Sequence, residues 1–243
     1  MRKRVVVFSG AGLSAESGIP TFRGSDGLWE NHRIEDVASP HGWKRNSKLV
    51  LNFYAMRFEK IQNVQPNAGH LALAKLQEKF DVINITQNID NLLERAGCKH
   101  VWHLHGRIDW QKCERHYDIF GFRDSYFNCD FKSEISKPVQ WGDKCPKCGA
   151  QLRPDVVWFG ESVDMRRETL EDLINTTSVF IGVGTSAQVY PAAGLLTLFE
   201  DAEQKFFIDP NPAYEALQGF EVIQSTAAKA LPELVQRLMQ DKA

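Results

Sequence analysis

Short apolar runs alternate along the chain with segments of helical periodicity. Six runs rich in β-branched and other apolar residues each end in polar residues or glycine: Arg4–Ser9, Asp81–Thr86, His100–Leu104, Ser178–Val183, Lys205–Ile208 and Glu221–Gln224. Such runs predict buried β-strands. Apolar residues recur at helical spacing over Ala68–Phe80 and near the C-terminus, where Pro232 is expected in the first turn of a helix. This alternation predicts an α/β fold with a parallel sheet and helices on both faces.

Two stretches interrupt the alternation. Residues 24–67 are polar and contain tryptophan without a convincing strand, and residues 107–153 hold four of the five cysteines without a long periodic helix. We interpret both as excursions that form a second, smaller lobe. The expected large lobe comprises residues 1–35, 68–106 and 154–243, and the small lobe comprises a helical insert, 36–67, and a second insert, 107–153.

The composition is that of a soluble globular protein. The 243 residues are 43% hydrophobic and 25% charged, with a formal net charge of −2. This charge argues against a protein that binds nucleic acid through bulk positive charge. No apolar run approaches the roughly 18 residues of a membrane span, and the N-terminal apolar stretch runs into a glycine turn. We therefore expect a cytoplasmic protein that binds neither nucleic acid nor membrane.

A glycine turn follows the first expected strand. Gly10, Gly12 and Ala15 give the pattern G-x-G-x-x-A, which is typical of a dinucleotide site but also occurs in ordinary turns. A hydride-transfer enzyme would place its next strand, ending in an acidic residue, about 20 residues later. Here the next expected strand begins only at Asp81. The sequence therefore argues against a plain oxidoreductase.

Six ordered motifs across the chain resemble those of the sirtuins. They are GAGLSAESGIPTFRGSDGLW at 10–29, TQNID at 86–90, LHG at 104–106, VVWFGE at 156–161, GTSAQVYPA at 184–192 and DPNP at 209–212. The resemblance implies a Rossmann-type NAD-binding lobe and a small zinc-binding lobe. It also implies NAD-dependent removal of acyl groups from protein lysines, which yields nicotinamide, O-acyl-ADP-ribose and free lysine.

The resemblance assigns the catalytic base and the cofactor-binding residues. It selects His105 as the general base for a ribose hydroxyl, whereas strand spacing alone does not choose between His105 and His103. Without the family, a hydrogen-bonded structural histidine is the alternative. The residues implied to bind NAD are Gly10, Ala11, Gly12, Ser14, Glu16, Phe22, Arg23, Trp29, Gln87, Asn88, Ile89, Asp90, Gly184, Thr185, Ser186, Asn211 and Ala227.

Tyr54 and Arg57 suggest which acyl group is removed. A helix is expected around Ser47–Ile61, with Leu49, Phe53 and Met56 on an apolar stripe and the Tyr54–Arg57 pair on its flank. A guanidinium and a phenol can together bind a carboxylate, although a solvated arginine beside a half-buried tyrosine is the alternative. Sirtuins that remove succinyl, malonyl or glutaryl groups carry a similar Tyr-x-x-Arg, and acetyl-lysine is not excluded.

The resemblance also implies how a modified protein substrate binds. Two segments would hold the acylated peptide as an added strand, and their residues are Val157, Phe159, Gly160, Val189 and Tyr190. We expect acylated proteins or peptides as partners and a monomeric enzyme.

The cysteines indicate a structural zinc site. Cys145 and Cys148 have the spacing of a zinc knuckle, and Cys113 is a third candidate ligand. Zinc needs a fourth ligand, for which His116 and Cys129 are alternatives, and loss of the metal is a further alternative. The zinc of this family is structural, so the open choice of a fourth ligand does not affect the assignment of His105 as the base.

Two other functions remain as alternatives. One is mono-ADP-ribosyl transfer to protein, and the other is a non-catalytic NAD- or ADP-ribose-binding module. His105, Asn88 and Asp90 argue against the binding module, because such a module needs no base.

Overall fold

The computed structural model describes residues 2–21, 28–29, 31–115, 129–185 and 194–240. These residues form two compact units. The first comprises Met1–Thr21, Val64–Leu104 and Asp164–Ala243, and the second comprises Phe22–Asn63 and His105–Val163. The division into domains that the sequence suggests stays a prediction. Among the described residues, every helix is too short or too polar to cross a membrane.

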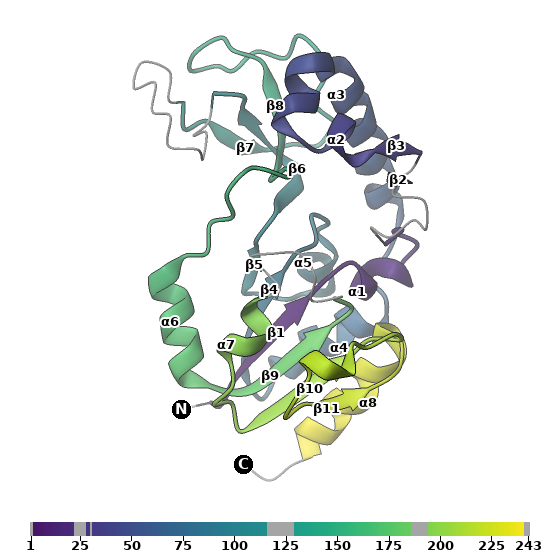
Figure 1. Cartoon of the computed structure of the whole chain (residues 1–243), viewed down its shortest axis with the longest axis vertical. Helices are drawn as coiled ribbons and strands as arrows, with labels where there is room; N and C mark the ends of the chain where they lie inside the picture. The colour runs from purple at the N-terminus through teal and green to yellow at the C-terminus, as the bar shows by residue number, and fades with distance from the viewer. Residues whose placement is uncertain (1, 22–27, 30, 116–128, 186–193, 241–243) are drawn as a thin grey trace. The chain divides into compact units, whose positions relative to one another are not determined.

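The first unit is built on a parallel sheet of six strands in the order β11-β10-β9-β1-β4-β5 (Figure 1). The strands are β1 (Arg4–Ser9), β4 (Asp81–Thr86), β5 (Val101–His103), β9 (Thr177–Val183), β10 (Gln204–Ile208) and β11 (Glu221–Ile223). All six predicted strands are confirmed, with ends that differ by at most one residue. The chain builds outward from β1 through β4 and β5, and then returns to place β9 on the other side of β1. The topological switch point therefore lies between β1 and β9.

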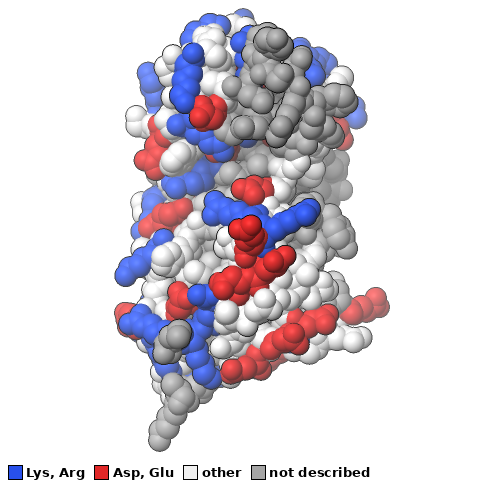
Figure 2. Space-filling model, turned by 90° about the vertical axis from the view of Figure 1, so that its left-hand side faces the viewer, with Lys and Arg blue, Asp and Glu red and all other residues white. Residues whose placement is uncertain are grey.

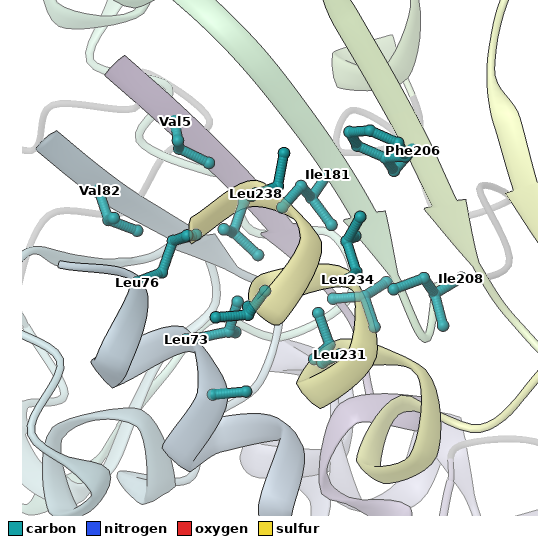
Figure 3. Close-up of a cluster of buried hydrophobic side chains, with 14 of the residues drawn as sticks. Val5, Leu73, Leu76, Val82, Ile181, Phe206, Ile208, Leu231, Leu234 and Leu238 are labelled. Atoms are coloured by element: carbon teal, nitrogen blue, oxygen red, sulfur yellow. The ribbon is translucent and has the colours of Figure 1, made fainter. Parts of the chain in front are cut away.

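Helices cover both faces of this sheet. They are α1 (Gly12–Ala15), α4 (Ala68–Leu76), α5 (Leu92–Ala96), α6 (Arg167–Thr176), α7 (Leu195–Leu198), the 3-10 turn η2 (Tyr214–Ala216) and α8 (Ala227–Gln240). Figure 3 shows α4 and α8 packing Leu73, Leu76 and Leu234 against one face of the sheet. On the other face, the ring of Phe180 in β9 stacks on that of Phe199, with centroids 4.5 Å apart. The alternation of side chains along each strand thus fills two cores.

The position of Pro232 differs from the prediction. Pro232 lies inside α8 rather than in its first turn, because the helix already begins at Ala227. A proline leaves the carbonyl four residues earlier without its helical partner. That carbonyl belongs to Ala228, in the first turn of α8, so only one early hydrogen bond is lost.

The second unit contains an antiparallel sheet and a helical segment. Its elements are β2 (Leu28–Trp29), β3 (His32–Arg33), α2 (Ile34–Val37), α3 (Pro40–Asn63), β6 (Gly106–Cys113), β7 (Lys132–Glu134) and β8 (Leu152–Val156). The sheet has the order β7-β6-β8. The sequence analysis did not identify these three strands, because each contains charged residues and none is a continuous apolar run.

Helix α3 carries the Tyr54–Arg57 pair, and it differs from the prediction in one respect. Its backbone is non-helical at Asn46, whose side-chain oxygen accepts a hydrogen bond from the Leu49 N–H at 3.1 Å. Asn46 thus caps a second helix that matches the predicted one. The apolar stripe was wrong at Met56, which is 50% exposed. Tyr54 and Arg57 are themselves buried, whereas the prediction placed them on the flank of the apolar stripe.

Charged side chains of both signs cover the surface. Figure 2 shows lysine and arginine interspersed with aspartate and glutamate on the face that it presents. Some of these charges pair, as Arg4 does with Asp81 at 2.9 Å and with Asp172 at 2.8 Å. This mixture agrees with a net charge close to zero.

Candidate functional site

The glycine turn after β1 meets the end of β9 at the switch point of the sheet. The Gly10 N–H donates to the Val183 carbonyl at 3.0 Å, and the Gly12 N–H donates to the Gly184 carbonyl at 2.9 Å. A Cβ on Gly12 would lie 2.6 Å from the Gly184 Cα, and Gly184 itself has a φ of +58°. Glycine is required here because two backbones touch.

The contact between the turn after β1 and the end of β9, called the glycine crossing below, changes the interpretation of the G-x-G-x-x-A pattern. The sequence assigned the glycines to the approach of a pyrophosphate, whereas their missing side chains make room for a neighbouring strand end. The N–H groups of Gly10, Gly12 and Leu13 already donate to backbone carbonyls. Helix α1 is a single turn. The roles of Gly10, Ala11, Gly12 and Gly184 toward NAD stay predictions.

A buried polar cluster lies where β1 and β4 end. The Ser14 hydroxyl donates to Asp90 Oδ2 at 2.9 Å, and the Asn88 amide donates to the Gly10 carbonyl at 3.0 Å and to Ser14 Oγ at 3.2 Å. Burial raises the pKa of Asp90, while hydrogen bonds from the Leu92 N–H and from Ser14 oppose the rise. The structure thus brings together three of the predicted cofactor residues, Ser14, Asn88 and Asp90.

His70 joins this cluster and was missed by the sequence analysis. Its Nδ1 accepts a hydrogen bond from the Asn67 N–H at 3.3 Å, and its Nε2 lies 3.4 Å from Ser14 Oγ. Burial lowers the pKa of His70 to about 4, so the ring is neutral at pH 7. Because Nδ1 accepts, Nε2 carries the proton and donates to Ser14. The only signal in the sequence is the capping position of His70, three residues after Asn67.

The other predicted cofactor residues of the first unit are held by their own contacts. The Gln87 amide donates to the Thr185 hydroxyl at 2.9 Å. Glu16 accepts from the Thr226 hydroxyl at 2.9 Å and from the Ala228 N–H at 2.7 Å, so its carboxylate caps the start of α8. Three more lie in the same unit: Ile89 in the loop after β4, Asn211 in the turn after β10, and Ala227 at the first position of α8.

The structure gives His103, in β5, and His105, two residues later, different surroundings. His103 places Nδ1 at 2.8 Å from the Asn88 carbonyl oxygen and Nε2 at 2.8 Å from a carboxylate oxygen of Glu94. Both ring nitrogens therefore serve internal hydrogen bonds to acceptors. His105 lies in the second unit, half-buried, and its carbonyl accepts from the Val157 N–H at 2.9 Å. The role of His105 as the base stays a prediction.

Tyr54 and Arg57 lie together inside the second unit. Tyr54 is 1% exposed, and its hydroxyl finds no hydrogen-bond partner among the described residues. Burial raises the pKa of Tyr54, and the nearby charge of Arg57 opposes this rise. The guanidinium carbon of Arg57 lies 4.2 Å from the ring centre of Trp29, which the sequence assigned to the cofactor. A buried guanidinium and a buried phenol that lie three residues apart on one helix are suited to bind an anion.

The segment after β8 holds the predicted peptide-binding residues. The Phe159 N–H donates to the Ala38 carbonyl at 3.0 Å, while its ring is 47% exposed. Gly160 has a φ of +90°, a conformation that favours glycine. Val157 and Phe159 are therefore fixed by backbone hydrogen bonds within the second unit.

Four cysteines converge in the second unit. Their sulfur atoms all lie within 4.8 Å of one another, with Cys113 and Cys148 at 3.4 Å and Cys129 and Cys145 at 3.5 Å. Four thiolates around zinc, with bonds of about 2.3 Å, have sulfur atoms roughly 3.8 Å apart. The donor set fits a structural zinc, and Cys129 is the fourth member.

Several predicted residues lie outside the described part of the chain. They are Phe22, Arg23, His116, Ser186, Val189 and Tyr190.

Comparisons with known proteins identify chains that are similar to this one. Residues 10–191 match the model of the Sir2 family. The NAD-dependent protein deacylase of Bacteroides thetaiotaomicron is 42% identical over 242 residues, 98% of each chain. That of Helicobacter pylori strain 26695 is 41% identical over 239 residues, again 98% of each. A solved Sir2 homologue in complex with NAD is 35% identical, with a TM-score of 0.83 over 98% of this chain and 90% of that one.

Proposed function

The chain belongs to the Sir2 family and is an NAD-dependent protein-lysine deacylase, and we propose that it removes acyl groups that end in a carboxylate, such as succinyl and malonyl, as well as acetyl. One observation carries this proposal. Tyr54 and Arg57 are both buried on α3, where a phenol and a guanidinium supply hydrogen-bond donors. A carboxylate satisfies such a pair better than a methyl group does.

The proposed chemistry assigns His105 as the general base. Bound NAD supplies the ribose carbon that receives the acyl oxygen as nicotinamide leaves. His105 accepts a proton from a ribose hydroxyl, because an imidazole can hold and release a proton near neutral pH. Gln87, Asn88 and Asp90 are proposed to bind the nicotinamide ribose and the carboxamide. The hydrogen bonds of Asn88 and Asp90 to Ser14 support this assignment, because they hold both side chains in fixed positions.

We propose that zinc stabilises the fold and takes no part in the reaction. The thiolates of Cys113, Cys129, Cys145 and Cys148 would hold it. Cys113, Cys129 and Cys145 also belong to a hydrophobic cluster with Leu51 and Leu152, so the metal would stabilise the core of the second unit.

Acylated proteins are the proposed substrates. Val157, Phe159 and Gly160, together with Val189 and Tyr190, would pair with the main chain of an extended peptide, which gives affinity with little side-chain selectivity. The monomeric state and the cytoplasmic location expected from the sequence stay predictions.

The acyl preference is tested with Arg57→Met. We expect kcat/KM for a succinyl-lysine peptide to fall by about 100-fold, because a buried charged hydrogen bond is lost, and kcat/KM for the acetyl-lysine peptide to change by less than about 3-fold. Arg45→Met is the matched control, since Arg45 lies on α3 but is exposed and pairs with Asp36. Equal losses for both peptides would reject the proposed carboxylate binding.

Nicotinamide release distinguishes the alternative reactions. Release that requires the acylated peptide supports deacylation. Release with NAD and unmodified protein alone would support ADP-ribosyl transfer, and no release under either condition would leave only a binding function.

A further inference from the structure

Two buried hydrogen-bond donors of the second unit lack a partner among the described residues. One is the hydroxyl of Tyr54, and the other is the indole N–H of Trp158, a residue that is 3% exposed. The indole N–H lies close enough to the hydroxyl to lower the pKa of Tyr54, but the two groups do not meet the geometry of a hydrogen bond. Buried donors without an acceptor are costly, so both are suited to a ligand that supplies one.

The indole ring of Trp158 is held firmly in place. The guanidinium carbon of Arg153 lies 3.8 Å from its ring centre, and the ring of Trp43 lies at 5.5 Å. The backbone N–H of Trp158 donates to Glu161 at 3.0 Å, and Glu161 forms an ion pair with Arg153. These contacts use the face and the backbone of Trp158 and leave its N–H for another partner.

We propose that the indole N–H of Trp158 is a third donor to the terminal carboxylate of the acyl group, beside Tyr54 and Arg57. This inference rests on the proposed removal of acyl groups that end in a carboxylate. All three residues belong to the second unit, on α3 and in the segment that follows β8.

The chemistry of the three groups points to a carboxylate. An indole N–H and a guanidinium only donate, and a neutral phenol donates one proton. A carboxylate offers about four lone-pair sites on two oxygens, which is enough for donors from three side chains. A methyl end, as in an acetyl group, offers none. Trp158 would therefore add selectivity for the acyl end without adding charge.

Trp158→Phe tests the inference, because it removes the N–H and keeps an aromatic ring beside Arg153 and Trp43. We expect KM for a succinyl-lysine peptide to rise about 10-fold, with kcat, KM for NAD and kcat/KM for an acetyl-lysine peptide changed by less than about 2-fold. Trp141→Phe is the matched control, since Trp141 lies in the same unit, is 55% exposed and contacts Lys48.

Comparison with Arg57→Met separates the two possible failures. If Arg57→Met lowers the succinyl activity selectively and Trp158→Phe does not, the role of Trp158 is rejected and the proposed function stands. If neither variant changes the ratio of succinyl to acetyl activity, or if the wild-type enzyme does not remove succinyl groups, both are rejected. An equal loss on both peptides in Trp158→Phe would show a structural role and also overturn the inference.

A direct measurement does not depend on the variant being active. The chain contains six tryptophans, so a 15N-labelled sample gives six indole signals at most. Without NAD, where no turnover occurs, a succinyl-lysine peptide should move the Trp158 signal downfield, and an acetyl-lysine peptide should not. The assignment comes from the signal that is missing in Trp158→Phe. A signal that responds equally to both peptides would contradict the inference.

Discussion

At the scale of single residues, hydrogen bonds connect His70, Ser14 and Asp90 in series. A neutral histidine donates to a serine hydroxyl, which in turn donates to a buried aspartate. The donor and the acceptor of each of these hydrogen bonds are defined, because the Asn67 N–H fixes the tautomer of His70. Two of the proposed cofactor residues, Ser14 and Asp90, are therefore oriented by a histidine on α4.

The low pKa of His70 makes stability depend on pH. The unfolded histidine binds its proton near pH 6.5 and the folded one only near pH 4. This contribution is therefore complete above about pH 6.5 and is lost as the pH falls toward 4. We expect it to weaken folding by about 2 kcal/mol between pH 7.5 and pH 5.0, measured by urea unfolding at both values.

The His70→Gln variant isolates this effect from other titrating groups. Glutamine can accept the Asn67 N–H as a capping residue but does not titrate. The fall in the free energy of unfolding between the two pH values should be smaller in the variant by about the same 2 kcal/mol. An identical pH dependence in both proteins would show that His70 does not stay neutral in the fold.

Individual residues also show what the sequence could and could not predict. Cys129 and His116 were equivalent candidates, because spacing does not reveal where the chain returns. In the structure the Cys129 N–H donates to the Arg115 carbonyl at 3.2 Å, which brings Cys129 back beside the end of β6. His70 was missed for the opposite reason, since its partners Ser14 and Asp90 lie far away in the sequence.

At the scale of elements, parallel strands were the easiest to predict. Buried on both faces, they appear as continuous apolar runs, as in β1 and β9. The strands β6, β7 and β8 lack such runs because charged residues such as Lys112 and Asp155 pair with one another inside them, at 3.2 Å. Met56 was misplaced because the buried face of α3 includes two polar side chains, Tyr54 and Arg57, which a purely apolar stripe does not describe.

The crossing of the turn after β1 and the end of β9 gives a prediction for Gly12→Ala. The new Cβ would meet the Gly184 backbone at 2.6 Å, and neither backbone can move without breaking the hydrogen bond between them. We expect a loss of about 1–3 kcal/mol and a melting temperature lower by several degrees, measured by differential scanning calorimetry.

Gly194→Ala is the control for this substitution. A Cβ on Gly194 has nothing within 4 Å, and its φ of −65° suits any residue. Its melting temperature should match the wild type or rise slightly. If Gly12→Ala were equally harmless, the close approach of the two strand ends would not be a property of the protein in solution.

At the scale of the whole molecule, each unit has its own core. The first unit packs α4 and α8 against the six-stranded sheet, and the second contains a hydrophobic cluster of Leu51, Leu152 and their neighbours with three of the four cysteines. The metal site is therefore part of the core of the second unit, and its loss should act locally.

Zinc removal tests this view. The purified protein should contain about one zinc per chain. A chelator should abolish amide hydrogen-exchange protection in β6 and β8 while β1, β4 and β9 stay protected, because the thiolates lose the ion that holds them together. A uniform loss of protection across both sheets would contradict separate cores.

Cysteine variants provide the control. Cys145→Ser should lower the zinc content, whereas Cys98→Ser should not, because Cys98 lies in the core of the first unit and outside the cluster of four cysteines. Equal zinc loss in both variants would reject the four-cysteine site.

The separate origins of the recognition residues have a consequence for protein engineering. Tyr54, Arg57 and Trp158 come from one unit, and the glycine crossing with its neighbouring polar cluster comes from the other. Libraries for directed evolution can therefore be confined to α3 and the stretch after β8. Variants with new acyl preferences should then leave the glycine turn and its polar cluster unchanged.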